Sequence, residues 1–160
     1  MQIKTKIVPC LWFDSQAEDA ARFYTSIFKG KITKTTHYTE AGHEVHGRPA
    51  GSVMTVVFEL AGQSFTALNG GPQFKFTEAI SFQVNCDTQD EIDHFWSKLT
   101  QGGQEGPCGW LKDQFGLSWQ VTPSMMGDFF ADPKTSGRVM QAMMKMKKLN
   151  IAELKRAQGH

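Results

Sequence analysis

Apolar and polar positions follow the same order in the two halves of the chain. Residues 6–13 are apolar enough for a buried strand, and the apolar positions from Ala17 to Phe28 then recur at the spacing of a helix. Residues 79–86 alternate between apolar and polar as a strand does, and the apolar positions from Ile92 to Leu99 return at helical spacing. The pattern predicts one strand followed by one helix in each half.

Residues that start and end helices repeat along with the strands. The segments Ser15 to Glu18 and Thr88 to Glu91 both have the capping-box form, in which a hydroxyl accepts from an early helix amide and a carboxylate reaches back. Glycines, which often end helices, follow at positions 30 and 102. The spacing between the two caps and the spacing between the two glycines agree to within one residue. We interpret the chain as two modules of the same design.

The segments after each predicted helix are typical of short strands joined by turns. Residues 61–63 indicate a tight turn, and Gly70-Gly71-Pro72 indicates a hinge between the modules. The first half therefore predicts the order β-α-β-β-β, with further strands at residues 31–38, 52–60 and 64–69. In the second half, residues 105–112 are short and interrupted by glycine, and residues 117–122 are expected to form the closing strand.

One domain is expected over residues 1–160. It consists of a first module of about residues 3–70, a second of about residues 74–123 and a C-terminal helical extension, residues 124–160. The methionines on one side of that extension are expected to fill gaps at a core edge or a subunit contact, because the thioether side chain adapts to irregular spaces.

The charge balance narrows the kinds of partner. Lys and Arg number 17 against 16 Asp and Glu, which argues against nucleic acid or an anionic membrane as the partner. No apolar run reaches the roughly 20 residues that span a bilayer, and the N-terminus does not resemble a signal segment. The three cysteines are odd in number and have no C-x-x-C spacing, as expected of reduced thiols. We expect a cytoplasmic location.

Several longer motifs resemble one branch of a known superfamily. These are PCLWFD, FYTSIF, FTALNGGPQFKF, CGWLKDQFGLSWQVTP and RVMQAMMKMKK. They are similar to the PhnB-like branch, often described as 3-demethylubiquinone methyltransferase-like, of the vicinal oxygen chelate superfamily, which includes glyoxalases, bleomycin-resistance proteins and dioxygenases. The resemblance implies an α+β fold in which two tandem β-α-β-β-β modules form cupped mixed sheets, and it implies a homodimer. The residues do not support methyl transfer, since no glycine-rich strand-to-helix loop with a downstream acidic partner is present.

The resemblance implies metal ligands on the first and last strands of each module, typically His, Glu or Gln. The matching positions here are Ile7 or Pro9, Thr66, Ala79 or Ser81, and Gln120. Of these side chains only Gln120 could coordinate, and one neutral amide does not hold a divalent ion. We therefore predict no cofactor, with a divalent metal as the alternative.

Two histidines, His43 and His46, have H-x-x-H spacing, and a third, His37, lies upstream. They are either part of a solvated loop or part of a metal or substrate loop over the mouth of the cup. His43, His46 and Gln120 are the candidate ligands if a metal binds.

Without a metal, the cup suits a small organic ligand. Ile80, Phe82 and Val84 are expected to cover the helix, which turns Gln83 and Asn85 inward. Aligning the repeats in the same way turns Leu11 and Phe13 inward and Cys10 toward the helix. The candidate ligand-binding residues are Gln83, Asn85 and Gln120 as hydrogen-bonding groups, with Phe13, Phe74, Phe76 and Trp110 as walls. Internal hydrogen bonds and plain core packing are the alternative roles for these side chains.

The sequence favours a metal-free protein that binds a small molecule, and it leaves open whether any catalysis occurs. A divalent-metal-dependent lyase, isomerase or dioxygenase is the first alternative, and it requires His37, His43 or His46 to reach the cup with Gln120. A resistance protein that sequesters a drug is the second. The near-neutral charge and the few acidic side chains at cup positions count against a cationic drug.

Overall fold

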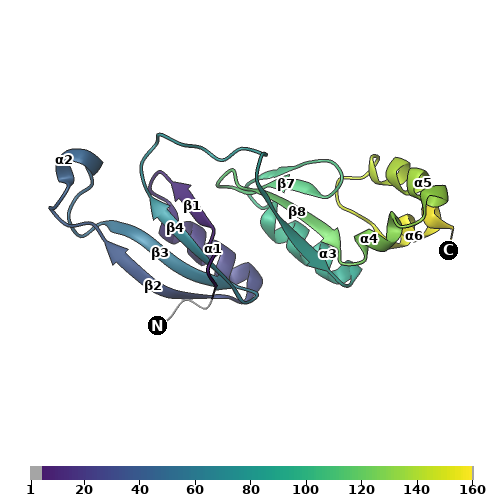
Figure 1. Ribbon diagram of the computed structural model, residues 1–160, viewed down its shortest axis with the longest axis horizontal. Helices are drawn as coiled ribbons and strands as arrows, with labels where there is room; N and C mark the ends of the chain where they lie inside the picture. The colour runs from purple at the N-terminus through teal and green to yellow at the C-terminus, as the bar shows by residue number, and fades with distance from the viewer. Residues whose placement is uncertain (1–4, 160) are drawn as a thin grey trace. The chain divides into compact units, whose positions relative to one another are not determined.

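The computed structural model describes residues 5–159, and the chain divides into two compact units (Figure 1). Unit 1 ends at Lys75 and unit 2 begins at Phe76. Each unit holds one four-stranded mixed sheet with helices, and a C-terminal helical extension follows the second sheet. The predicted α+β fold of two modules with a helical extension is confirmed.

Unit 1 is a β-α-β-β-β module with a short extra helix. Its sheet has the order β1-β4-β3-β2, in which β1 runs parallel to β4 and the other neighbours are antiparallel. Because β1 and β4 are parallel neighbours, the chain between them crosses over through α1. The elements are β1 (Cys10–Phe13), α1 (Ala17–Phe28), β2 (Lys31–His37), α2 (His43–His46), β3 (Val53–Leu60) and β4 (Gln63–Asn69).

Unit 2 repeats this topology in the order β5-β8-β7-β6, with β5 parallel to β8. Helix α3 packs on β5 and β8, and three further helices gather beyond the sheet (Figure 1). The elements are β5 (Ser81–Cys86), α3 (Gln89–Leu99), β6 (Gln104–Glu105), β7 (Trp110–Lys112) and β8 (Ser118–Pro123), and those of the extension are α4 (Met126–Phe129), α5 (Pro133–Met143) and α6 (Ile151–Gln158).

The side chains of β1 point to the opposite faces of the sheet from those predicted. Leu11 and Phe13 are buried, Phe13 to 4% exposure, whereas Cys10 is exposed. In the parallel pairing Leu11 lies opposite Ala67, which is on the buried face of the sheet that α1 covers. The prediction that Leu11 and Phe13 turn into the cup and Cys10 toward the helix is therefore wrong.

The error has a simple geometric origin. Successive strand residues point to opposite faces, so an alignment that slips by one residue exchanges the two faces of a strand. The spacing of the two capping segments aligns Cys10 with Gln83 and Trp12 with Asn85 of the second repeat. The spacing of the two glycines is one residue shorter and aligns Leu11 with Gln83 instead. The structure follows the caps, so Cys10 and Trp12 occupy the cup face of β1.

The two helix starts differ in how they are capped. At α3 the Thr88 hydroxyl accepts from the Glu91 amide at 3.2 Å, and the Glu91 carboxylate accepts from the Asp87 amide at 2.7 Å. At α1 no side chain of the N-cap residue accepts a bond, and the Ala17 amide donates instead to Asn69 Oδ1 at 2.8 Å. The predicted capping box is confirmed at Thr88 and wrong at Ser15.

This contrast predicts unequal effects of removing the two hydroxyls. Thr88→Ala should lower the free energy of unfolding by about 1 kcal/mol, because an early amide of α3 loses its acceptor. Ser15→Ala should change it by less than about 0.5 kcal/mol, as is usual at surface positions without such a role. Urea denaturation of both variants measures the difference, and equal losses would contradict the assignment of the caps.

Candidate ligand-binding site

The sheet of unit 2 has one face covered by a helix and one polar face. Val84, Cys86 and Val121 are buried on the side of α3, and burial raises the pKa of the Cys86 thiol to about 12. The intervening residues point the other way: Gln83 lies opposite Gln120, and Asn85 lies opposite Thr122. This polar face, which we call the unit 2 cup, is the face on which the sequence predicts ligand binding.

A cavity of about 320 Å³ lies on the unit 2 cup. Its floor comes from β5, β7 and β8, and one side comes from the C-terminal extension. None of the described residues that line it is charged. The lining residues are Gln83, Asn85, Cys108, Trp110, Gln120, Thr122, Pro123, Ser124, Met126, Gly127, Phe130 and Met143.

The amide side chains of the cup are only partly used inside the protein. Gln120 Nε2 donates to Ser81 Oγ at 2.9 Å, and Thr122 Oγ1 donates to Asn85 Oδ1 at 3.4 Å. No hydrogen bond within residues 5–159 engages the Gln83 amide, Asn85 Nδ2 or Gln120 Oε1. An amide carries both donors and acceptors, so the cup offers both to a ligand.

A glycine-flanked loop shapes the side of the cavity next to Trp110. Cys108 has φ 57° and Gly109 has φ 84°, so two successive residues take the left-handed conformation. The amides of Cys108 and Gly109 donate to the carbonyls of Met146 and Lys147, both at 2.8 Å. The loop is therefore held in place by the C-terminal extension.

Four of the seven predicted ligand-binding residues come together in this cavity: Gln83, Asn85, Trp110 and Gln120. The other three do not line it. Phe13 is part of the core of unit 1, Phe74 is 65% exposed and makes an edge contact with Trp12, and Phe76 lies half-buried at the start of unit 2. Sequence reasoning missed Met126, Phe130 and Met143, because helical periodicity does not say which surface a helix covers.

The matching face of unit 1 has a different chemistry. Cys10 lies opposite Thr66 where unit 2 has the glutamine pair. Trp12 takes the place of Asn85, and its indole donates to the Gly71 carbonyl at 2.8 Å. The ring lies so close to Gly70 that a Cβ there would come within 2.3 Å of Trp12 Cζ2. The free amide groups of the cup are thus a feature of unit 2.

The residues present do not fit a divalent metal site. Residues 5–159 contain no cluster of three or more His, Cys, Asp or Glu side chains arranged to hold an ion. His46 uses both ring nitrogens, since Nδ1 accepts from the Arg48 amide at 2.9 Å and Nε2 lies 3.2 Å from the Ala41 carbonyl. At the predicted ligand positions in unit 2, Ser81 and Gln120 bond to each other. The cup therefore presents hydroxyl and amide groups, which bind divalent ions weakly.

Comparison with known proteins assigns the chain to a family. The family model described as 3-demethylubiquinone-9 3-methyltransferase matches residues 5–122. The chain is 36% identical to a solved PhnB protein from Bacillus cereus, described as a putative member of that family, with a TM-score of 0.64 over 74% of this chain and 99% of the other. The chain belongs to the PhnB-like family. The matched region ends just before the C-terminal extension.

More distant structures share the fold alone. The fosfomycin resistance protein FosX from Mesorhizobium loti is 11% identical, with a TM-score of 0.57 over 82% of this chain and 100% of that chain. FosX from Listeria monocytogenes, solved with Mn(II) and sulfate, is 13% identical, with a TM-score of 0.54 over 81% of this chain and 98% of that chain. Together with the PhnB protein, these place the fold in the vicinal oxygen chelate superfamily. No curated protein matches the sequence significantly.

Within residues 5–159, no helix is both long and apolar enough to cross a lipid bilayer.

Proposed function

We propose that this PhnB-like protein binds a small organic ligand in the unit 2 cup without a metal. The observation that carries the proposal is a cavity whose floor presents the Gln83 side-chain amide, Asn85 Nδ2 and Gln120 Oε1, none of them engaged within residues 5–159, beside the Trp110 ring. Ligand sites commonly combine apolar walls with a few polar groups that orient the ligand. Here the amides supply the orienting groups and Trp110 supplies an apolar wall.

A metal-dependent lyase, isomerase or dioxygenase is the second candidate. The observation that favours it is the shared fold with a FosX protein solved with Mn(II). In this chain such an activity requires His37, His43 or His46 to act with Gln120. The ring bonds of His46 to its own loop oppose that arrangement.

We do not propose methyl transfer, although the family description names it. A nucleotide-type cofactor site needs a glycine-rich turn between a strand and a helix. The turns that lead into α1 and α3 carry Asp14-Ser15-Gln16 and Asp87-Thr88 at these places.

We propose a cytoplasmic homodimer as the working form. The dimer follows from the resemblance to the superfamily, and native mass spectrometry measures it directly. The cytoplasmic location is supported by the three cysteines, Cys10, Cys86 and Cys108, which are all free thiols.

Thermal-shift measurements separate the two candidate functions. A panel of neutral metabolites should contain ligands that raise the melting temperature, because a ligand that binds only the folded state stabilises it. Gln83→Leu and Gln120→Leu should abolish that shift. The control Gln101→Leu, at an exposed position of the turn after α3, should retain it.

The same assay with Mn(II), Ni(II), Fe(II) and Zn(II) tests the metal-dependent enzyme. The proposal expects no specific shift with untagged protein. A rise of several degrees that is lost in His43→Ala or Gln120→Leu would favour the metal enzyme instead.

A further inference from the structure

We infer that the C-terminal extension is a fixed wall of the unit 2 cup and that it restricts the ligand to a flat, uncharged molecule with an amide-like polar edge. This inference rests on the proposed function and adds the class of ligand and the element that selects it. The wall lies outside the region that the family model matches, which ends at residue 122.

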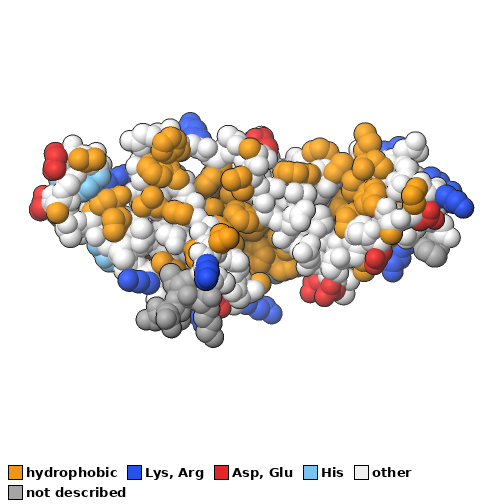
Figure 2. Space-filling view, in the orientation of Figure 1, with side chains coloured by type: hydrophobic (Ala, Val, Ile, Leu, Met, Phe, Trp, Pro, Cys, Tyr) orange, Lys and Arg blue, Asp and Glu red, His pale blue; other side chains and the backbone are white. Residues whose placement is uncertain are grey.

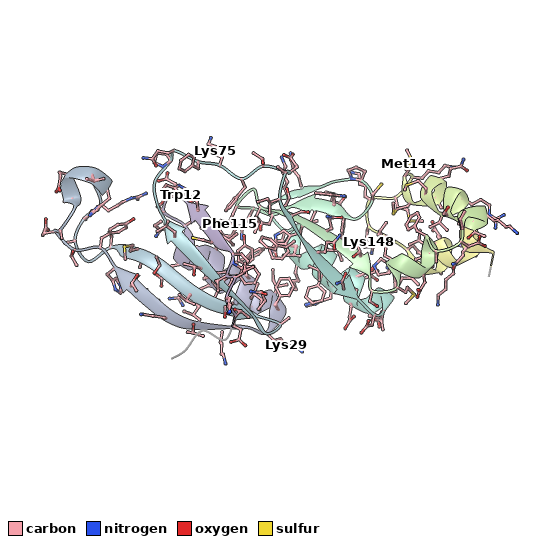
Figure 3. All side chains as sticks on the ribbon, in the orientation of Figure 1. Trp12, Lys29, Lys75, Phe115, Met144 and Lys148 are labelled. Carbon is pink, nitrogen blue, oxygen red and sulfur yellow. The ribbon has the colours of Figure 1, made fainter. Side chains whose placement is uncertain are left out.

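The extension reaches the cavity through three apolar side chains. Met126 and Phe130 come from α4 and its C-cap, and Met143 ends α5. Figure 3 places Met144, the next residue, at the outer side of the extension, and it is 66% exposed. Adjacent methionines thus take different roles, one lining the cavity and one in solvent.

The chain between α5 and α6 is bound firmly to the rest of unit 2. The Gln89 side chain holds it at two points, donating to the Leu149 carbonyl at 3.1 Å and accepting from the Ile151 amide at 2.9 Å. Leu149 itself is fully buried. Together with the bonds from Cys108 and Gly109 to Met146 and Lys147, these contacts attach the segment between α5 and α6 to the loop before β7 and to α3.

An ion pair adds to this attachment. Lys148 Nζ lies 2.6 Å from Asp93 Oδ1 on α3, and Figure 3 shows Lys148 on the side of the extension that faces the sheet. The hydrogen bond from Lys148, and after it that from Gln89, lowers the pKa of the Asp93 carboxyl. The pair therefore contributes above the ordinary carboxyl pKa and is lost only as the pH falls through the lowered value.

The charge of the ligand follows from the lining. Among residues 5–159, no charged side chain lines the cavity, so an ionised ligand would lose hydration without gaining an opposite charge. A neutral ligand with one carbonyl and one amino group side by side matches the free Asn85 Nδ2, Gln120 Oε1 and Gln83 amide.

The shape of the ligand follows from the walls. Trp110 and Phe130 both line a cavity of about 320 Å³, which is near the lower end of small-molecule sites. A single flat ring fits such a space, and the thioethers of Met126 and Met143 adapt to its edge. A primary carboxamide on an aromatic ring is the simplest molecule with all these properties.

Three probes of similar shape test the charge preference on the full chain. Benzamide is neutral, benzoate is an anion and benzamidine is a cation, and isothermal titration calorimetry compares their affinities. We expect benzamide to bind at least tenfold more tightly than either ion, and Gln120→Leu to lower its affinity at least tenfold. Equal or tighter binding of benzoate or benzamidine, or no binding of benzamide, would overturn the inference.

A matched pair of variants tests the role of the wall. Met143→Ala should raise the affinity of 2-naphthamide relative to benzamide at least fivefold, because it removes apolar volume from the cavity wall. Met144→Ala, one residue on but exposed, should leave the ratio unchanged. If Met143→Ala leaves the ratio of the two affinities unchanged, the extension does not limit the size of the ligand. The proposed function still holds in that case, provided that Gln120→Leu weakens the binding of benzamide. If benzamide and 2-naphthamide both still bind to Gln83→Leu and to Gln120→Leu, the proposed site itself is refuted.

Discussion

Asp113→Ala is expected to lower the free energy of unfolding by about 3 kcal/mol, because three donors lose their acceptor at once. Asp113 is 3% exposed and stands at the turn between β7 and β8. Its Oδ1 accepts from the amides of Phe115 and Leu117 at 2.8 and 3.1 Å, and its Oδ2 accepts from Trp119 Nε1 at 2.8 Å. Urea denaturation followed by tryptophan fluorescence measures the loss.

Asp113→Asn serves as the control for this prediction. One amide oxygen still accepts from the two backbone amides, whereas the amino group meets the indole N–H donor. We expect a loss between that of the alanine variant and zero. A loss below about 1 kcal/mol for Asp113→Ala would contradict the view that this carboxylate holds the turn.

Asn69→Ala is expected to lower the free energy of unfolding by about 2 kcal/mol, because it leaves a buried amide and a half-buried carbonyl without partners. Asn69 is 6% exposed. Its Oδ1 accepts from the Ala17 amide, and its Nδ2 donates to the Val53 carbonyl at 3.1 Å. One side chain thus joins the start of α1 to β3 and β4.

Asn69→Asp separates the two bonds. The acceptor for the Ala17 amide is kept, whereas the Val53 carbonyl then faces a carboxylate oxygen instead of a donor. The free energy of unfolding should fall, because the bond to the Val53 carbonyl is lost. The start of α1 should stay intact, so the Ala17 amide should remain protected from hydrogen exchange. Loss of protection at Ala17 in the aspartate variant, or a stability change below about 0.5 kcal/mol in Asn69→Ala, would contradict the role assigned to Asn69.

The order of strands and helices could be predicted because it depends on local period. Alternation at residues 79–86 and helical spacing from Ala17 to Phe28 specify the elements without reference to distant residues. The second capping box could also be predicted, because Thr88 and Glu91 bond to each other within one helical turn. The first could not, because the acceptor at α1 is Asn69, which is far away in the sequence.

The face of the sheet to which each side chain points could be predicted only where the strand's own residues alternate between apolar and polar. In β5 the alternation of Val84 with Gln83 and Asn85 indicates the two faces directly. The prediction that Ile80 also covers the helix is wrong, because Ile80 precedes β5 and is 69% exposed. In β1 the facing depended on an alignment of the repeats that was uncertain by one residue, and Leu11 and Phe13 were assigned to the wrong face.

The polar floor of the candidate site could therefore be predicted, but its wall could not. Gln83, Asn85 and Gln120 share a face by strand geometry alone. The hydrophobic side chains of the extension, seen as a cluster over the C-terminal helices in Figure 2, indicate burial without naming the surface that they meet. Gln89 and Leu149 decide that surface through contacts between distant residues.

Side-chain amide resonances offer the most direct test of ligand binding in the unit 2 cup. In ¹H–¹⁵N spectra of the full chain titrated with benzamide, the amides of Gln83, Asn85 and Gln120 and the indole of Trp110 should shift together, while Gln101 stays unchanged. If benzamide leaves these four signals unshifted, the proposed organic ligand site is contradicted. Selective broadening of the four signals by Mn(II), with no response to benzamide, would likewise contradict a metal-free cup.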